Sequence, residues 1–549
     1  MKIALCQFNP SVGDLQHNTK ELLSAINHAK GLGCDLLITP ELALCGYFPQ
    51  DLLLVNQFHH QCQIQLEKLQ KASTEITTII GSPRVKDSQI FNSACIFNKT
   101  NQIAVYDKNI LPNYGVFDEK RYFTPGNQRV TFEIGQTKIG VVICEDIWGE
   151  LDFTDYPSVD LLCILNASPF EANKQEQRYQ IVKNLAPTIN APIIYLNCVG
   201  GQDELVFDGA SFMVDKHGEL ILQLDAFKSE LAIFEFNPNN ALDELSLNVY
   251  SHQGTEIKLR QHPITPYPNN YEAIYTALKL GLYDYVYKNK FSKVLLGLSG
   301  GIDSALVLKL AVDALGRDNV DAIMLPTDYT SEQSYTDANQ LIDKLGVRHN
   351  LIDIEPIFKQ IKLSLEPIFE GLDQDLTEEN LQARIRGMLL MAISNKLGHL
   401  VLVTSNKSEV ATGFGTLYGD MAGGFAPIKD VYKTMVFDLC KWINRNGEII
   451  PNSIITKAPT AELRPNQLDQ DSLPPYDLLD QILYQIIEQN QSSIEIINKG
   501  FTKDVVEKVV RLVKLSEYKR KQSAPGTKVS SRGFGLDWRY PITNGFKVN

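Results

Sequence analysis

A short turn in the middle of the chain has the composition of a phosphate-binding loop. The residues before it, 294–297, are apolar and predict a buried strand, and the apolar residues after it, 305–315, predict a helix. A strand, a glycine-rich turn and a helix start direct backbone N–H groups and the helix dipole at an anion. A carboxylate in such a loop would repel phosphate, so Asp303 predicts a Mg²⁺ ion between the two. The alternative is a plain Ser/Gly turn at a helix start. The loop consists of Ser299, Gly300, Gly301, Ile302, Asp303 and Ser304.

Three residues of the N-terminal half could together hydrolyse an amide. Glu41 follows an apolar run, Lys108 lies in the segment 106–112, and Cys144 ends the apolar run 139–143. A thiol is mostly protonated at neutral pH, so a carboxylate must remove its proton before the sulfur attacks an amide carbon. A lysine ammonium can stabilise the oxyanion, and the carboxylate can return the proton to the departing ammonia. Singly, these residues are also typical of a core thiol, a turn and a solvated charge.

The composition restricts the class of protein. The 549 residues are too many for one hydrophobic core and predict roughly two to four domains. The net charge of −13 disfavours a nucleic-acid surface, which needs clustered Lys and Arg. No apolar run approaches the length of a membrane span, so no membrane partner is expected. Nine cysteines without a C-x-x-C pair predict reduced, buried thiols and therefore a cytoplasmic protein.

Short apolar strands alternate with helical patterns on both sides of one compositional break. The stretch 236–270 is rich in Asn and Pro and lacks a long periodic segment, which indicates a domain linker. We therefore expect an N-terminal domain over 1–245, a linker over 246–270 and a C-terminal domain over 271–549. Both halves are of the α/β class. The predicted strands are 3–7, 36–39, 76–81, 93–97, 139–143, 161–165 and 193–196 before the break, and 294–297, 322–324, 350–354 and 400–404 after it.

The segments around the three N-terminal residues resemble the nitrilase, or carbon–nitrogen hydrolase, superfamily. The resemblance implies an α-β-β-α sandwich in which Glu41 is the general base, Lys108 the oxyanion stabiliser and Cys144 the nucleophile. It also assigns residues to the glutamine site of the glutaminase branch, through the segments 112–119, 166–170 and 200–203. Those residues are Tyr114, Glu119, Ser168 and Asp203.

The C-terminal half resembles the ATP pyrophosphatase families, whose SGGxDS loop it carries, and among them the NAD synthetases. The segments 404–409, 412–415 and 418–420 match that family, and 380–386 predicts a helix with Asn380 and Arg384 on one face. A salt-bridged helix surface is the alternative for 380–386. Because two independent motif sets occur in one chain, residues 3–546 resemble the glutamine-dependent NAD synthetases. This implies a doubly wound, Rossmann-like parallel sheet in the C-terminal domain.

The resemblance assigns roles to individual residues of the C-terminal half. Asp303 and Glu409 are expected to hold Mg²⁺, and Thr404 and Lys433 to join the loop residues at the ATP site. The expected contacts of deamido-NAD are Asn380, Arg384, Asp420 and Thr460, where many relatives carry Ser in place of Thr460. The basic tail from Tyr518-Lys519-Arg520 onward is expected either to meet nucleotide phosphates or to be a solvated surface.

The implied reaction is a two-step ligation. ATP and the nicotinate carboxylate of deamido-NAD form a carboxyl-adenylate, and ammonia released from glutamine converts it to NAD, giving AMP, diphosphate and glutamate. The family also implies a homo-oligomer formed through the synthetase domain. Two other functions remain open at this point. One is another adenylating amidotransferase of the same ATP pyrophosphatase type, and the other is a nucleotide-binding sensor without catalytic activity.

Overall fold

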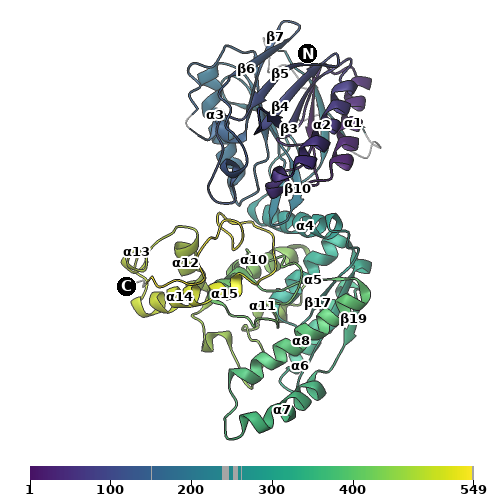
Figure 1. Ribbon diagram of the computed structural model, residues 1–549. Helices are drawn as coiled ribbons and strands as arrows, with labels where there is room; N and C mark the ends of the chain where they lie inside the picture. Colours follow the sequence, from purple (N-terminus) through teal and green to yellow (C-terminus); the bar gives the residue numbers. More distant parts are fainter. Residues whose placement is uncertain (150, 238–246, 252–256, 261–262, 547–549) are drawn as a thin grey trace. The chain divides into compact units, whose positions relative to one another are not determined.

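The computed structural model describes residues 1–149, 151–237, 247–251, 257–260 and 263–546, and it divides into two compact units, Met1–Asn270 and Tyr271–Asn549 (Figure 1). Each unit has its own sheets and its own apolar cores. The α/β class expected for both halves is confirmed. In the part of the chain that the structure describes, no helix combines the length and the apolar character needed to cross a membrane.

The first unit is built on two packed sheets. The larger sheet has the strand order β16-β15-β14-β1-β2-β3-β4-β5, and the smaller has the order β13-β12-β9-β8-β7-β6. The strands of the larger sheet are β1 (Lys2–Gln7), β2 (Leu36–Ile38), β3 (Thr77–Lys86), β4 (Gln89–Asn98), β5 (Asn101–Asp107), β14 (Glu230–Glu235), β15 (Leu247–Ser251) and β16 (Ile257–Arg260). Those of the smaller are β6 (Val130–Ile134), β7 (Thr137–Ile143), β8 (Leu161–Asn166), β9 (Ile193–Asn197), β12 (Phe212–Val214) and β13 (Leu220–Gln223). The hairpin of β10 (Val199–Gln202) and β11 (Leu205–Asp208) stands apart from both sheets.

Helices cover the outer faces of the two sheets, which confirms the α-β-β-α sandwich. The helices α1 (Leu15–Gly31) and α2 (Asn56–Ala72) lie on one side and α3 (Lys174–Ile189) on the other (Figure 1). Side chains of a strand alternate between its two faces. Accordingly, Ile3 and Leu5 of β1 belong to the core between the sheets, whereas Ala4 and Cys6 pack with residues of α1 and α2.

The segment predicted as a linker, 246–270, contributes strands to the first unit. β15 pairs antiparallel with β14, and β16 pairs antiparallel with β15, so this segment extends the larger sheet at its edge. The residues 246, 252–256 and 261–262 of the predicted linker lie outside the described residues. The sequence indicated no strand here because the Asn- and Pro-rich stretch masks two short β-segments that find their partner only in the folded sheet.

The second unit contains a parallel sheet with the order β19-β18-β17-β20. Its strands are β17 (Val294–Gly297), β18 (Val320–Met324), β19 (Arg348–Leu351) and β20 (Leu400–Val401). The chain moves outward from β17 to β18 and β19 on one side and returns to place β20 on the other. This reversal beside β17 is the topological switch point of a doubly wound fold, where ligands bind at the carboxyl ends of the strands. The Rossmann-like expectation is confirmed.

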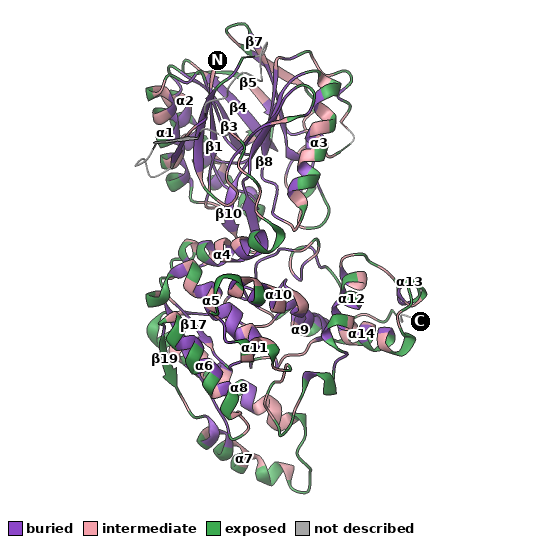
Figure 2. Cartoon of the chain, turned by 180° about the vertical axis from the view of Figure 1, so that it is seen from behind, coloured by how far each residue is buried: buried purple, intermediate pink, exposed green. Residues whose placement is uncertain are grey.

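Helices surround this sheet and form a second layer beyond it (Figures 1 and 2). An apolar cluster joins α9, α12, α13 and α14, and another lies between the sheet and α7 and α8. The helices are α4 (Asn270–Lys288), α5 (Ile302–Leu315), α6 (Glu332–Leu345), α7 (Glu355–Phe369), α8 (Leu376–Leu397), α9 (Lys407–Thr412), α10 (Lys433–Ile443), α11 (Asn452–Thr456), α12 (Tyr476–Ile487), α13 (Ser493–Asn498), α14 (Lys503–Leu515) and α15 (Glu517–Arg520).

A close approach of two backbones in the first unit gives a test of this packing. A Cβ atom on Gly81 of β3 would lie 2.1 Å from the carbonyl oxygen of Pro40 and 2.6 Å from the amide nitrogen of Leu42. We expect Gly81→Ala to lower the free energy of unfolding of the first unit by about 1–3 kcal/mol, the usual cost of overpacking. Urea unfolding followed by hydrogen exchange of first-unit peptides measures this. Gly31→Ala is the control, because a Cβ there meets nothing within 4 Å; equal stability of the two variants would contradict the prediction.

Candidate active sites

A lysine held between two carboxylates forms the centre of the first unit's site. Lys108 Nζ lies 2.7 Å from Glu41 Oε1 and 2.8 Å from Glu119 Oε1, and the three side chains are fully buried. Burial alone would lower the pKa of Lys108, but Glu119 and Glu41 raise it well above its ordinary value. Burial also raises the pKa of Glu119, to about 7. The lysine is therefore a permanent cation in a dry site, where its field on a developing oxyanion is strong.

Cys144 follows the last residue of β7 and has a strained backbone. Its φ of +45° lies in the left-handed region, which a non-glycine residue adopts at a cost that functional sites commonly bear. Burial, followed by the charge of Glu41, raises the pKa of the Cys144 thiol well above its ordinary value, and Lys108 opposes them. The resting sulfur is therefore a thiol and needs a base before it can act as a nucleophile.

Hydrogen bonds from the protein orient the predicted base. Glu41 Oε1 accepts from Asn92 Nδ2 at 2.7 Å, and Glu41 Oε2 accepts from the backbone N–H of Ala167 at 2.9 Å. On the other side of the lysine, the Tyr47 hydroxyl donates to Glu119 Oε1 at 2.8 Å. The sequence analysis did not identify Asn92 or Tyr47, because neither lies in a segment that matched a family motif.

A third residue not predicted from the sequence, Asp146, joins the cysteine segment to the lysine segment. Its Oδ2 accepts from the Ile143 N–H and the Tyr106 hydroxyl, and its Oδ1 accepts from the N–H groups of Asn109 and Ile110, all at 2.7–3.0 Å. Burial raises the pKa of this carboxyl to about 6. The sequence did carry a signal for this residue. A carboxylate two residues after a candidate nucleophile is close enough to accept a hydrogen bond from the backbone at the strand end.

Polar residues around Cys144 could hold the amino-acid part of a substrate. The Tyr114 hydroxyl donates to both carboxylate oxygens of Glu145 at 3.0 Å, and Tyr114 is 55% exposed whereas Glu145 is buried. Burial raises the pKa of Glu145, which sits next to Cys144 in the chain. The sequence analysis identified Tyr114 and missed Glu145. Together they form an acidic, partly open wall that suits an ammonium group.

Ser168 and Asp203 differ in their surroundings. Ser168 is buried two residues after β8, and its hydroxyl accepts from Arg178 Nε at 3.1 Å. Asp203 is exposed in the turn between β10 and β11, where its carboxylate accepts from the neighbouring Gln202 at 3.2 Å. Within the described residues, no hydrogen bond joins Asp203 to Glu41, Lys108 or Cys144.

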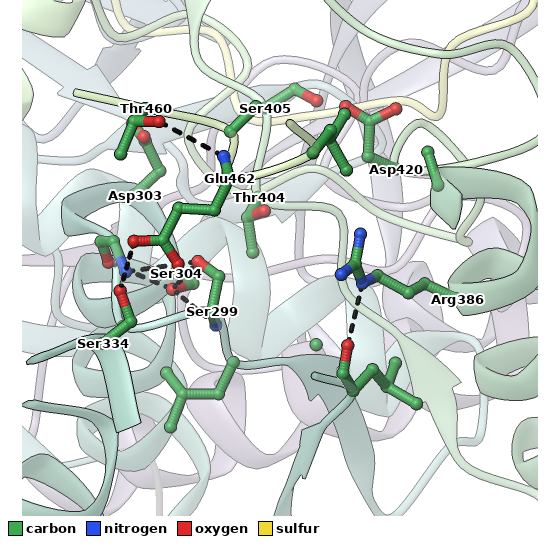
Figure 3. A pocket seen from close by; sticks show the side chains of 18 of the residues that line it. Ser299, Asp303, Ser304, Ser334, Arg386, Thr404, Ser405, Asp420, Thr460 and Glu462 are labelled. Carbon is green, nitrogen blue, oxygen red and sulfur yellow. Dashed lines mark hydrogen bonds between the residues drawn. The ribbon is translucent and has the colours of Figure 1, made fainter. Parts of the chain in front are cut away.

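The predicted phosphate loop lies at the switch point of the second unit and lines a cavity of about 300 Å³ (Figure 3). Gly300 has a φ of +77°, and a Cβ there would lie 2.4 Å from the Ser334 carbonyl oxygen, so the turn requires glycine. The helix α5 starts at Ile302 without a side-chain cap, which leaves its first N–H groups directed at the cavity. The Ser304 hydroxyl donates to the Gly301 carbonyl at 3.0 Å and fixes the loop.

Here too a lysine lies between two carboxylates. Lys433 Nζ contacts Asp303 Oδ2 and lies 3.2 Å from Glu409 Oε1, and Asn406 Nδ2 donates to Asp303 Oδ1 at 2.9 Å. Burial alone would lower the pKa of Lys433, but Asp303 and Glu409 raise it; burial raises that of Glu409 to about 8. These two carboxylates are 17% and 16% exposed, so they remain open to the cavity.

The two carboxylates fit a magnesium ion that shares its shell with phosphate. Mg²⁺ prefers oxygen ligands and is usually bound by one or two carboxylates together with substrate phosphates and water. Asp303 and Glu409 already share one cation, the Lys433 ammonium. Among the described residues, no group of three or more His, Cys, Asp or Glu side chains could hold a metal by itself. The described residues therefore contain no metal site built from protein ligands alone, whereas Asp303 and Glu409 could bind a metal together with the phosphates of a nucleotide.

The remaining predicted residues of the second unit occupy two different places. Thr404, Asp420 and Thr460 line the cavity. Asn380 Oδ1 accepts from the Thr416 hydroxyl at 2.7 Å, and Arg384 is exposed, with Nε donating to the Leu417 carbonyl at 3.3 Å. These two face the segment next to the cavity but are not in its lining.

Arg386, one helical half-turn after Arg384, does line the cavity (Figure 3). Its Nε donates to the Leu325 carbonyl at 2.9 Å, and burial lowers its pKa to about 10. The guanidinium remains charged at neutral pH and is directed into the cavity. The sequence predicted Arg384, at i, i+4 from Asn380, and not Arg386, because the spacing alone does not show which side of α8 faces the sheet.

A hydrogen-bond network around the Glu462 carboxylate, on the opposite side of the cavity from Arg386, was also not predicted from the sequence. Glu462 Oε1 accepts from Lys457 Nζ at 2.7 Å and from the hydroxyls of Ser331 and Ser334 at 2.8 Å each, and the Glu462 N–H donates to Thr460 Oγ1 at 3.2 Å (Figure 3). These contacts attach the segment that carries Thr460 to the start of α6. They bring together residues more than 120 positions apart, which no local pattern could indicate.

Both halves of the chain match known protein families. The carbon-nitrogen hydrolase family model matches residues 2–241, and the NAD synthase family model matches residues 274–523. A glutamine-dependent NAD(+) synthetase of Acinetobacter baylyi is 45% identical over 100% of this chain and 99% of its own length, and one of Thermotoga maritima is 43% identical over the same shares. The solved structure of a glutamine-dependent NAD(+) synthetase of Acinetobacter baumannii, in complex with ADP, is 43% identical, with a TM-score of 0.77 over 100% of this chain and 99% of that one. Because this likeness spans both domains in one order, the chain belongs to the glutamine-dependent NAD(+) synthetase family.

Proposed function

We propose that this enzyme makes NAD from deamido-NAD, with ATP to activate the carboxylate and glutamine to supply the nitrogen. The observation that carries this is the presence of two complete sites in one chain of that family, one with Glu41, Lys108 and Cys144 and one with the phosphate loop. Incubation with ATP, Mg²⁺, glutamine and deamido-NAD tests it, with the products identified by mass. NAD and AMP are expected, and ADP in place of AMP would contradict the adenylation step.

In the first unit, Glu41 removes the proton of the Cys144 thiol, and the thiolate attacks the side-chain amide carbon of glutamine. The Lys108 ammonium stabilises the oxyanion of the tetrahedral intermediate. Glu41 then gives its proton to the nitrogen as the C–N bond breaks, which releases ammonia and leaves a thioester on Cys144. Water, deprotonated by Glu41, hydrolyses the thioester to glutamate and restores the thiol.

Polar residues near Cys144 bind the rest of the glutamine molecule. Glu145, held by Tyr114, is placed to accept the substrate's α-ammonium, and the Ser168 hydroxyl is placed to contact its amino-acid head. Glu119 acts through Lys108, which it holds beside Glu41. Asp203 remains a proposed contact from the family resemblance; its exposed hairpin turn would have to reach the substrate from outside the buried cluster.

In the second unit, the nicotinate carboxylate attacks the α-phosphorus of ATP and pyrophosphate leaves. Ammonia then attacks the carboxyl-adenylate, AMP leaves, and the amide of NAD is formed. The N–H groups at Ile302 and the loop, with the hydroxyls of Ser299 and Ser304, are placed to bind the β- and γ-phosphates. Thr404 lines the same cavity, and the Lys433 ammonium offsets charge on the leaving pyrophosphate.

Asp303 and Glu409 would hold Mg²⁺ against these phosphates, where the ion neutralises part of their charge. Asp420 and Thr460 line the cavity and are proposed to contact deamido-NAD. Asn380 and Arg384 lie beside the cavity and are proposed to bind a part of deamido-NAD that extends out of it.

We also propose that two copies of the chain associate through the outer face of α7 and α8. Large apolar side chains of these two helices are exposed, at Leu363, Ile368, Leu376, Met388, Met391 and Leu397. Exposed apolar patches of this kind are typical of interaction surfaces. A cytoplasmic location is consistent with the cysteines, all nine of which are buried thiols.

The division of labour between the sites predicts the effect of removing the nucleophile. Cys144→Ala should lower glutamine-dependent NAD synthesis by on the order of 10³-fold or more, the usual loss for a nucleophile. Synthesis from ammonium salts should be unchanged, because ammonia reaches the adenylate without Cys144. NAD formation is measured with each nitrogen source. Cys163→Ala, which removes a fully buried thiol of β8, is the control and should keep both activities. Loss of both activities in a folded Cys144→Ala enzyme would refute the division.

Removal of one carboxylate at the phosphate loop should affect both nitrogen sources. We expect Asp303→Asn to lower glutamine-dependent and ammonium-dependent synthesis together, by roughly 10²-fold or more, since activation of the carboxylate precedes either amine. Rates at saturating Mg²⁺ and ATP measure this. Asp318→Asn, at a side chain that is 94% exposed, is the matched control. Normal ammonium-dependent turnover in Asp303→Asn would show that this carboxylate has no part in the reaction.

A charge on the outer face of α8 should weaken self-association. Met388 is 54% exposed, and Met388→Asp should shift the protein toward the mass of a single chain in light scattering, because a buried carboxylate at an interface is costly. Ile494→Asp is the control, since Ile494 is 59% exposed on α13 and lies outside the proposed face. A single-chain mass for the unmodified enzyme at assay concentration would rule out the proposed association.

A further inference from the structure

The chain is tied to the smaller sheet of the first unit just before it passes into the second. The Gln223 N–H at the end of β13 donates to the Pro263 carbonyl at 2.9 Å, and the Thr265 N–H donates to the Gln223 carbonyl at 3.0 Å. The Gln223 side chain donates to the Thr265 carbonyl at 2.7 Å. These bonds hold the segment 263–265 as an extra length of extended chain, and Tyr267 follows it three residues before α4 begins at Asn270.

Tyr267 reaches a carboxylate from this segment. Its hydroxyl donates to Asp208 Oδ2 at 2.7 Å. Asp208, the last residue of β11, is fully buried, and it also accepts from Arg178 Nη1 at 2.7 Å and 2.9 Å. Burial and the Asp208 charge raise the pKa of the Tyr267 hydroxyl, so it is protonated and a hydrogen-bond donor at neutral pH.

Arg178 links Asp208 to Ser168 of the proposed glutamine site through hydrogen bonds. Its side chain is fully buried in α3, and its three nitrogen atoms donate to four residues, Asp208, Ser168, Gln175 and Pro169. Nη1 contacts Asp208, whereas Nη2 donates to the Ser168 carbonyl at 2.9 Å and Nε donates to the Ser168 hydroxyl at 3.1 Å. Because the Ser168 oxygen accepts from Arg178, its own proton is left to be donated, and the planar guanidinium sets the direction.

We propose that Tyr267 is a positioning residue of the glutamine site, acting through Asp208 and Arg178 on Ser168. The inference rests on the proposed role of Ser168 as a glutamine contact. Each link is a charge-assisted hydrogen bond, and Asp208, Arg178 and Ser168 are buried. Loss of the Tyr267 hydroxyl therefore leaves the Asp208 carboxylate with one donor fewer, which changes its pull on Arg178, while the bonds of Arg178 to Gln175 and Pro169 keep its side chain in place. The segment that leads to the synthetase unit is thereby part of the glutaminase site. A purely structural role would instead hold the fold together without reaching the substrate.

Tyr267→Phe tests the proposal, because it removes one hydroxyl and keeps the ring. The KM for glutamine should rise about three- to tenfold, the range for one lost hydrogen bond to a charged group that acts indirectly. NAD synthesis from ammonium salts should not change. Tyr122→Phe is the matched control, since the Tyr122 hydroxyl also donates to a carboxylate at 2.7 Å, that of Asp51, but at the surface. An unchanged KM in Tyr267→Phe, or an equal rise in Tyr122→Phe, would overturn the proposal.

A double-mutant cycle with Ser168→Ala separates the relay from a structural role. If Tyr267 acts through Ser168, the double variant should have nearly the KM of Ser168→Ala alone. If the two effects multiply, the route through Ser168 is wrong and the proposal fails. Ser168→Ala also tests the premise. A normal KM in that variant would remove Ser168 from the proposed glutamine site and the inference with it, whereas a raised KM beside a normal one in Tyr267→Phe would overturn the inference alone.

Discussion

Each unit of this enzyme is organised around a lysine that lies between two carboxylates. In the first unit Lys108 contacts Glu41 and Glu119, and in the second Lys433 contacts Asp303 and Glu409. Burying three charges costs several kcal/mol for each ion unless their mutual attraction and further hydrogen bonds offset that cost. Such a cluster therefore adds little to the stability of the fold and needs hydrogen-bond donors around its carboxylates. Donors from the surrounding structure supply these hydrogen bonds, among them Asn92 and Tyr47 in the first unit and Asn406 in the second. Strand ends hold the clusters in place. In the proposed reactions, the cost is borne where a fixed cation is needed, opposite an oxyanion in one unit and beside phosphates in the other.

In both units, the ends of strands fix the positions of the residues proposed to form the sites. In the sandwich, β2, β5, β7 and β8 end at the same edge, and the active residues follow those ends within a few positions. Lys108 comes directly after β5 and Cys144 directly after β7, while the N–H of Ala167, directly after β8, donates to Glu41. In the second unit the loop after β17 occupies the switch point. Side chains anchored at strand ends move little, which suits sites that must hold reacting groups within a fraction of an ångström.

The sequence predicted the parts of the sites that depend on local order. A strand followed by a glycine turn and a helix is a local pattern, so the loop from Ser299 to Ser304 could be located, and so could a cysteine at a strand end. The residues that brace these groups could not. Asp146 binds the backbone of two segments, and Glu462 binds side chains more than 120 positions away. That Arg386 lines the cavity and Arg384 lies beside it could not be predicted for a related reason, since helical spacing gives a face but not which face the sheet covers. Likewise, β15 and β16 became strands only because β14 offered an edge.

The two lysine clusters differ in exposure, and the difference follows from what each must do. The Lys108 cluster is sealed, with no exposure of its three side chains, and its proposed substrate group is a neutral amide, on which negative charge develops as an oxyanion while a thioester replaces the C–N bond. A closed environment strengthens those electrostatic effects and needs no exchange of partners. The carboxylates beside Lys433 are partly exposed, and in their proposed role they would hold a metal ion together with phosphates in addition to contacting a lysine ammonium. Because a sealed cluster could not exchange one cation for another, the partial exposure of the second site supports its proposed role in binding a charged nucleotide.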